Sequence, residues 1–314
     1  MTPADQDAMR ALFHESFGHE MPPEQFRWKY GDGAGDGVGV WENDTLVAHY
    51  GGFGRLLWIG DTAVAAVQIG DVMVSPRSRG VLTRRGPFVQ AATSYFERRL
   101  APRGPAAFAF GFPSRRHLDL GRLLGIYDSA DQVADVRWTL HDIAPPGCWY
   151  ETRRLVRLEG AYVARTERLV AAMRRDLPDR VVGDRSASYL NYRYGGWGDY
   201  ALYALLLRPL GLLVGLFAIR APASAGGECE LLDVIGRLRH FPVLSRAAGA
   251  AARTLGAGTL HTWATTAPAA VFARCGATVE PTDVDIAVST WPDPQAARGT
   301  QGRFWLLSGD TDFR

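Results

Sequence analysis

The stretch Asp71–Phe88, DVMVSPRSRGVLTRRGPF, decides how the rest of the chain is interpreted. It begins as the end of an apolar strand, passes through a segment rich in glycine and arginine, and enters a helix with Pro87 in its first turn. Free N–H groups and the positive end of a helix dipole favour a dianionic pyrophosphate at such a point. Gly80 and Gly86 let the backbone approach a ligand closely, and four arginines supply charge: Arg77, Arg79, Arg84 and Arg85.

The sequence around this stretch alternates apolar runs with turn signals. Upstream we expect a helix over residues 5–18, a short helix near Glu24–Trp28, and a β-meander over residues 37–76. Downstream the pattern predicts two helices and two strands: a helix at Pro87–Leu100, a strand at Ala106–Gly111, a helix at Ser114–Leu124 and a strand at Val133–Leu140.

The second half of the chain predicts the same order of elements. Helices near residues 162–175 and 186–194 precede strands at 200–208, 212–220 and 228–234, a helix at 242–255, a strand at 259–264, a helix at 268–275, and strands at 283–289 and 303–308. The segment His141–Val156, with its Pro-Pro-Gly, is the best candidate for a linker. We therefore expect an α/β chain (an α+β mixed sheet) with domains at 1–144 and 145–314. The two domains are expected to repeat the same topology without repeating the amino-acid sequence.

A meander whose last strand enters a Gly/Arg loop and then a helix resembles the GNAT acyltransferase superfamily. Three further segments resemble its tandem members: Gly111-Phe112-Pro113, Tyr189–Tyr194 (YLNYRY) and Gly309–Phe313 (GDTDF). The family's loop pattern, Arg or Gln, two residues, Gly, one residue, then Gly or Ala, is stretched here, and a solvated turn is the alternative. The corresponding stretch of the second half, IGRLRHFPVLSRAAG, has bulky Leu238, His240 and Phe241, so we expect a degenerate second GNAT-like domain that completes the substrate cleft.

The resemblance implies that acetyl-CoA or another acyl-CoA is the co-substrate. The residues expected to bind it lie on the strand, the loop and the two following helices: Met73, Val74, Arg79, Gly80, Val81, Thr83, Arg84, Arg85, Gly86, Pro87, Phe88 and Ser114. In the family, backbone amides of the strand before the loop serve the thioester carbonyl, which places Met73 and Val74 there. Ser114 is also read as a helix N-cap.

Acyl transfer to an amine needs a base for the ammonium proton and a proton donor for the thiolate. Asp71, just upstream on the same strand, is the candidate base, and a strand-end charge that pairs with an arginine is the alternative. His117 and Tyr127 are the candidate donors. A structural histidine and an aromatic packing residue are the corresponding alternatives.

Four residues are candidates for binding the acceptor. Trp28 and Tyr30 fall where the family lines its acceptor pocket, although core aromatics are the alternative. Asp310 and Asp312 form a carboxylate pair that could bind an ammonium group or satisfy a turn by hydrogen bonds to its backbone.

Composition narrows the classes of function. A formal net charge of +2 argues against a general nucleic-acid or membrane-surface binder. Three dispersed cysteines fit neither a disulfide framework nor a zinc site, and we expect no metal. The first residues lack the basic and apolar regions of a signal peptide, so we expect a cytoplasmic protein, as a monomer or homodimer.

The resulting prediction is an acyl-CoA-dependent N-acyltransferase that moves an acetyl or other short acyl group to a small-molecule amine. Two alternatives remain. One is a non-catalytic GNAT-fold protein that binds a ligand, and the other is a GNAT-fold transferase that uses a long-chain acyl or aminoacyl-tRNA donor.

Overall fold

The computed structural model describes residues 5–31, 35–78, 86–100, 102, 104–195, 199–291 and 295–311. The chain forms two compact units that are interleaved in sequence. Unit 1 comprises Met1–Leu56, Val64–Asp128 and Ala287–Gly299, and unit 2 comprises Leu57–Ala63, Ser129–Ile286 and Thr300–Arg314. The domains expected at 1–144 and 145–314 refer to two repeated halves, and that boundary stays a prediction.

The first half of the chain contains two short helices, a three-stranded meander and an alternation of helices and strands. The elements are α1 (Gln6–Phe17), α2 (Pro23–Tyr30), β1 (Gly35–Glu42), β2 (Thr45–Ile59), β3 (Thr62–Val74), the 3-10 helix η3 (Pro76–Ser78), α3 (Pro87–Arg99), β4 (Phe108–Gly111), α4 (Arg115–Leu123), β5 (Tyr127–Thr139) and η4 (Leu140–Asp142).

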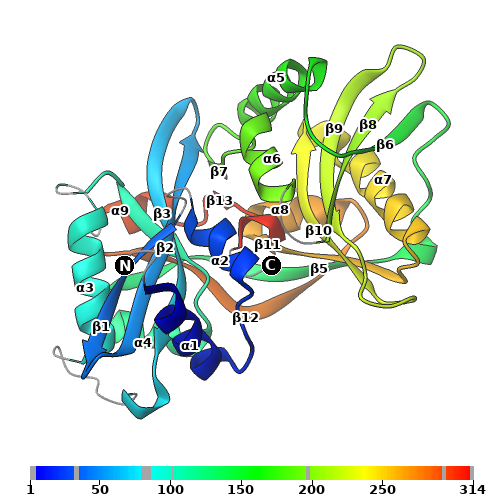
Figure 1. Ribbon diagram of the computed structural model, residues 1–314. Helices are drawn as coiled ribbons and strands as arrows, with labels where there is room; N and C mark the ends of the chain where they lie inside the picture. Colours follow the sequence, from blue (N-terminus) through cyan, green and yellow to red (C-terminus); the bar gives the residue numbers. More distant parts are fainter. Residues whose placement is uncertain are drawn as a thin grey trace. The chain divides into compact units, whose positions relative to one another are not determined.

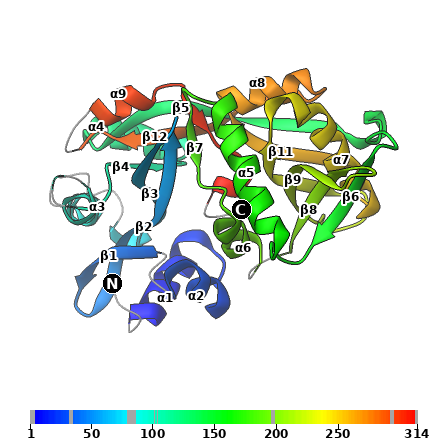
Figure 2. The same ribbon diagram turned by 90° about the horizontal axis from the view of Figure 1, so that it is seen from above.

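The sheet of unit 1 is mixed. β1 pairs antiparallel with β2, which neighbours β3, and β3 pairs in parallel with β4 from Ala66↔Phe108 to Ile69↔Gly111. The end of the late strand β12 (Thr278–Ser289) then pairs antiparallel with β4. α3 packs its apolar face on one side of this sheet, around Tyr50 and Val67, and α1 and α2 pack on the other, around Leu46 and Met73 (Figures 1 and 2).

The second half of the chain repeats this order. Its elements are β6 (Tyr150–Leu155), α5 (Ala161–Asp176), β7 (Val181–Gly183), α6 (Ala187–Tyr194), β8 (Tyr200–Leu207), β9 (Leu212–Arg220), β10 (Glu228–Gly236), η5 (Leu238–His240), α7 (Phe241–Thr254), β11 (Thr259–Thr265), α8 (Thr266–Arg274), β12, α9 (Gln295–Thr300), β13 (Phe304–Trp305) and η6 (Ser308–Asp310).

The strands of unit 2 enclose the larger core. Its main sheet has the order β12-β5-β11-β10-β9-β8-β6, in which β10 and β11 are parallel and β5 pairs antiparallel with β11. Strands β8 to β10 pass between α5 and α6 on one side and α7 on the other (Figures 1 and 2). The residues between the layers are almost entirely apolar and buried, including Trp138, Phe217, Phe241 and Trp305.

The expected mixed α/β fold is confirmed. Both halves have the succession of two helices, three strands, helix, strand, helix and strand, although in the second half β7 lies between the two helices. Apart from the 3-10 helices, three described elements were not expected: β6, β7 and α9. The linker assigned to His141–Val156 is therefore wrong over its second part. Tyr150–Leu155 forms an edge strand that pairs with β8 from Tyr150↔Leu207 to Leu155↔Leu202. Its sequence, YETRRL, is mostly polar and charged and so lacks the apolar pattern that predicts a strand.

Candidate active site

The two parallel strands of unit 1 end at different points. β4 ends at Gly111, whose ladder partner is Ile69, whereas β3 continues to Val74 and leads through η3 towards α3. The peptide groups that follow Ile69 on β3 therefore run past the end of β4. A strand that continues beyond its neighbour in this way can present backbone donors to the carbonyl of a thioester.

The N-terminus of α3 follows this open edge. Gly86 is the N-cap residue, with φ −67° and ψ 150°, and as a glycine it has no side chain to cap the helix. Pro87 at the first position has no N–H, so the amides of the first turn begin at Phe88. The loop residues expected to complete the site lie outside the described residues: Arg79, Gly80, Val81, Thr83, Arg84 and Arg85.

The residues expected on the strand and at the helix start are placed on different faces. The Met73 side chain is buried among α1 and α2, while Val74 is half-buried on the next position of β3. Phe88 packs edge-on against the ring of Tyr50, with centroids 6.0 Å apart, and Pro87 is buried. The burial of the Met73 side chain leaves its backbone as the part that could contact a thioester, and the roles of Met73 and Val74 stay a prediction.

Asp71 is the centre of a buried polar cluster. Its carboxylate accepts hydrogen bonds from Lys29 Nζ at 2.7 Å and from Tyr30 Oη at 2.5 Å. Its backbone carbonyl accepts a hydrogen bond from His49 Nδ1 at 2.7 Å. Asp71 also has a positive φ of 49°, in the left-handed region. The expected strand-end carboxylate is therefore present, but its partner is the chain's single lysine rather than an arginine.

The other two catalytic candidates lie together at α4. Tyr127 Oη donates to the carbonyl of His117 at 2.8 Å, and the Tyr127 ring packs against Gly121, where a Cβ would collide with it. Burial raises the pKa of Tyr127, so it remains a phenol at neutral pH. Ser114 is the N-cap residue of α4, but its hydroxyl contacts His117 Nδ1 at 3.1 Å instead of capping the helix.

The four acceptor candidates are divided between the units. Trp28 and Tyr30 lie on α2 in unit 1, and Tyr30 contacts the rings of Phe26, His49 and Phe53. Asp310 belongs to unit 2, where its carboxylate is buried and accepts from the N–H of Leu307 at 2.9 Å. This is the turn hydrogen bond given as the alternative role for Asp310. Asp312 lies outside the described residues.

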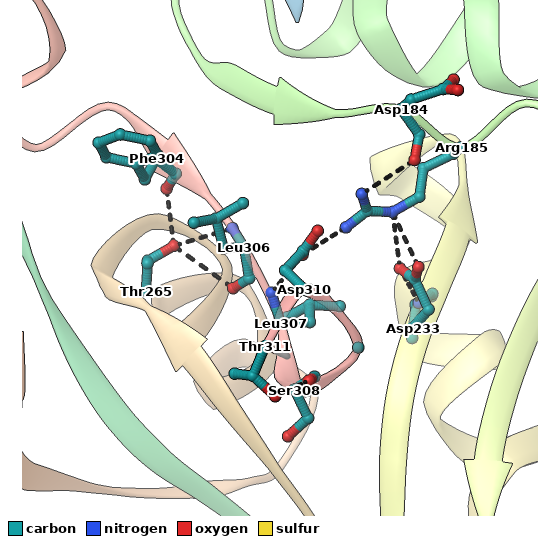
Figure 3. A network of polar contacts seen from close by, with 12 residues as sticks. Asp184, Arg185, Asp233, Thr265, Phe304, Leu306, Leu307, Ser308, Asp310 and Thr311 are labelled. Atoms are coloured by element: carbon teal, nitrogen blue, oxygen red, sulfur yellow. Dashed lines mark hydrogen bonds and ion pairs between the residues drawn. The ribbon is translucent and has the colours of Figure 1, made fainter. Parts of the chain in front are cut away.

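Unit 2 contains a second buried cluster, around Arg185. The guanidinium donates to Asp233 on β10 and to Asp310 on η6, with N–O distances of 2.8 Å and 2.6 Å (Figure 3). Burial alone lowers the pKa of Arg185, but the two carboxylates raise it well above its usual value. Tyr194 at the end of α6 also donates to Asp233, at 3.2 Å.

The two clusters occupy equivalent positions in the two halves. The second helix ends in Lys29-Tyr30 in the first half and Arg193-Tyr194 in the second, and each tyrosine donates to the aspartate of an Asp-Val pair on the third strand. Those pairs are Asp71-Val72 and Asp233-Val234. We expected the two halves to share their topology but not their amino-acid sequence, and that expectation is wrong at these positions. Aligning FRWKY with LNYRY would have found Lys29, which the sequence reasoning missed.

The segment before α7 in the second half is bound by a carboxylate of the protein. Asp176 accepts from Arg237 Nε at 2.7 Å and from the N–H of Leu238 at 3.0 Å. The arginine and the backbone amide that precede α7 are therefore already bound to an anion of the protein.

Neither a metal site nor a membrane-spanning helix occurs in the described part of the chain. No group of three or more His, Cys, Asp or Glu side chains there is arranged to hold a metal ion. Nor does any described helix have the length and apolar character needed to cross a membrane.

Comparison with known proteins identifies the fold. A model of the GNAT acetyltransferase domain matches residues 1–117. A search of curated protein sequences gives no match. Similar solved structures include a probable N-acyltransferase from Enterococcus faecalis (14% identity, TM-score 0.68, covering 92% of this chain and 70% of that one). They also include a GCN5-related N-acetyltransferase from Kribbella flavida (18%, 0.65, 92% and 69%) and N-myristoyltransferase from Saccharomyces cerevisiae with bound myristoyl-CoA (12%, 0.60, 92% and 80%).

These findings confirm the resemblance to the GNAT superfamily that the loop and the strand order indicated. The first 117 residues match the family's domain, and the fold of the chain is that of GNAT acyltransferase structures.

Proposed function

We propose that this protein transfers an acetyl or other short acyl group from acyl-CoA to the amine of a small molecule, with acyl-CoA bound at the first GNAT-like half. One observation carries the proposal: β3 runs past the end of β4 and leads to α3, whose N-cap residue Gly86 has no side chain to cap the helix. An open strand edge for a thioester carbonyl and an open helix start for a pyrophosphate then follow each other in the chain.

The residues of the first half divide the work as follows. The amides of the loop and of the first turn of α3 hold the pyrophosphate, and the loop arginines add charge. The backbone of β3 at Met73 and Val74 polarises the acyl carbonyl. Asp71 is the candidate proton acceptor. Lys29 and Tyr30 fix its orientation, and a carboxylate has free lone pairs for a further donor, either the amine itself or a water molecule. Tyr127 and His117 remain the candidates for returning a proton to the CoA thiolate.

Only the first half is proposed to bind acyl-CoA. In the second half, the Asp176 carboxylate already accepts hydrogen bonds from Arg237 and from the N–H of Leu238, which precede α7. Asp233 forms an ion pair with Arg185. A pyrophosphate there would have to displace the Asp176 carboxylate. The second half is therefore proposed to be the degenerate copy.

The direct test is release of CoA from a series of acyl-CoA donors, from acetyl to myristoyl, with a panel of small amines. We expect thiol release that depends on the amine and is fastest with a short acyl group. No release with any amine, together with tight CoA binding, would instead support a non-catalytic ligand-binding protein.

A long-chain donor is the second candidate, because the N-myristoyltransferase structure with bound myristoyl-CoA is similar over 92% of this chain. In the same assay, a preference for myristoyl-CoA over acetyl-CoA would favour that candidate and overturn the short-chain proposal.

The loop assignment predicts the effect of a double variant, Arg79→Ala with Gly86→Val. The torsion angles of Gly86 are accessible to any residue, so valine preserves the fold but places methyl groups where the pyrophosphate approaches. Loss of the arginine contact alone should weaken CoA binding by about 1.5–3 kcal/mol, measured by calorimetry.

The matched control is Arg239→Ala, an exposed arginine on the corresponding 3-10 segment of the second half. It should leave the dissociation constant unchanged. Equal binding by the double variant and the wild type would refute the loop assignment.

A further inference from the structure

His49 is a buried histidine with one bound and one unbound ring nitrogen. Its side chain on β2 is 1% exposed, and Nδ1 lies 2.7 Å from the carbonyl oxygen of Asp71. A carbonyl oxygen only accepts, so Nδ1 carries the proton. Nε2 is then a lone-pair acceptor in the neutral ring, and it has no hydrogen-bond partner among the described residues.

The surroundings of the ring favour this neutral tautomer. Burial lowers the pKa of His49 and outweighs the Asp71 carbonyl and carboxylate, which raise it; Lys29 lowers it further. Tyr30 packs edge-on against the ring, with centroids 6.1 Å apart. Gly37 and Gly51 leave room for it, because a Cβ at either position would collide with the imidazole.

The hydrogen bond from His49 meets the chain at an unusual point. Asp71 adopts a positive φ of 49°, which non-glycine residues rarely do, just beyond the last parallel pair of β3 and β4. A donor fixed on the Asp71 carbonyl orients the peptide group that joins Asp71 to Val72. It thereby orients the start of the open edge of β3.

The second half shows that the fold does not need a histidine here. Leu46-Val47-Ala48-His49-Tyr50 aligns with Leu213-Val214-Gly215-Leu216-Phe217, so Leu216, which is fully buried, replaces His49. In the same alignment Ala218 replaces Gly51, and Asp233, equivalent to Asp71, is not among the residues with a positive φ. The histidine, the glycine that accommodates it and the left-handed aspartate occur together in the first half and not at the aligned positions of the second.

We propose that His49 is a positioning residue of the acyl-transfer centre: its Nδ1–H group holds the Asp71 carbonyl and so fixes the backbone of β3 that receives the acyl group. This inference rests on the proposed function, because it assumes that the thioester binds at this edge. It assigns no proton transfer to the ring itself.

Three substitutions separate the two nitrogens of the ring. His49→Asn keeps a donor at the position of Nδ1, His49→Gln keeps a polar group only near the position of Nε2, and His49→Leu reproduces the second half. We expect His49→Leu and His49→Gln to lower kcat about a hundredfold through misplaced backbone, with little change in KM for acyl-CoA because the loop is untouched. His49→Asn should recover most of the lost rate.

Two outcomes overturn the proposal. If His49→Gln retains activity and His49→Asn does not, Nε2 is the functional atom and the ring acts directly on a proton. If all three variants are as active as the wild type, His49 is only a core residue. Thermal unfolding and calorimetric CoA binding of each variant show whether a loss of rate reflects loss of the fold.

Nitrogen NMR of the full-length wild type with labelled histidine gives a readout besides activity. We expect a neutral His49 ring protonated at Nδ1, and an Nε2–H tautomer would contradict the geometry. Should the wild type release no CoA with any amine, the proposed function fails, whereas the tautomer still tests the contact between His49 and Asp71.

Discussion

A chain truncated after Ala144 is expected to be insoluble or to lack a cooperative unfolding transition, although it contains every residue of the proposed CoA loop. Unit 1 would lose residues 287–299, which follow the rest of that unit by more than half of the chain. Among these, Ser289 Oγ accepts from the N–H of Ala109 at 3.0 Å, and Trp291 stacks on Phe96 with centroids 6.3 Å apart.

The same truncation would remove β11, the strand that pairs with β5. Val136 and Trp138 are at most 1% exposed, and residues 133–139 of β5 pair with β11, which the fragment lacks. An uncovered apolar strand with free backbone groups favours aggregation. The measurement is solubility on expression, followed by thermal unfolding of any soluble material.

Co-expression with residues 145–314 is the control for this prediction. The second fragment supplies both β11 and residues 287–299, so a soluble complex that binds CoA is expected. A soluble fragment 1–144 that melts cooperatively and binds CoA by itself would show that the two halves fold independently.

Replacing Arg185 with methionine should produce the largest loss of stability from a single substitution. Methionine keeps most of the volume but leaves the carboxylates of Asp233 and Asp310 buried without their cation. Removal of one partner from a buried ion pair typically costs about 3–5 kcal/mol. Urea unfolding of the variant and the wild type measures the difference in the free energy of unfolding.

Two controls support the interpretation. Arg157→Met removes an exposed arginine 3.7 Å from Glu159 and should have little effect on stability. Adding Asp233→Asn and Asp310→Asn to Arg185→Met removes the uncompensated charges and should restore much of the lost stability. If Arg185→Met unfolds at the same urea concentration as the wild type, the cluster does not stabilise unit 2.

Most of the fold could be predicted because the elements carry clear local signals. Alternating apolar runs with turns at residues 42–44 and 60–61 predicted the meander, and Pro87 and Pro242 marked the starts of α3 and α7. β6 was missed because an edge strand with charged letters lacks the apolar pattern on which the prediction depends. Residues 57–63 belong to unit 2 and residues 287–299 to unit 1. These assignments depend on tertiary contacts, which the periodicity of the sequence does not report.

The site could be predicted only in part, because some of its residues acquire their roles from tertiary contacts and not from a local sequence pattern. A loop rich in glycine and arginine indicates pyrophosphate binding from the sequence alone. A carboxylate on the preceding strand likewise indicates a candidate base. Lys29 carries no such local signal and stands out only when the two halves are aligned. The role of His49 comes from the burial and contacts that β2 gives it around Asp71. The equivalence of Asp71 with Asp233 became visible only when the two clusters were compared.

Titration of CoA into the full-length protein, followed by calorimetry, tests the central claim most directly. The glycine N-cap of α3 in the first half and the Asp176-bound segment in the second predict a single site per chain, weakened by Arg79→Ala with Gly86→Val. Two equivalent sites per chain, or no binding of CoA at all, would contradict the claim that the first half alone holds the acyl donor.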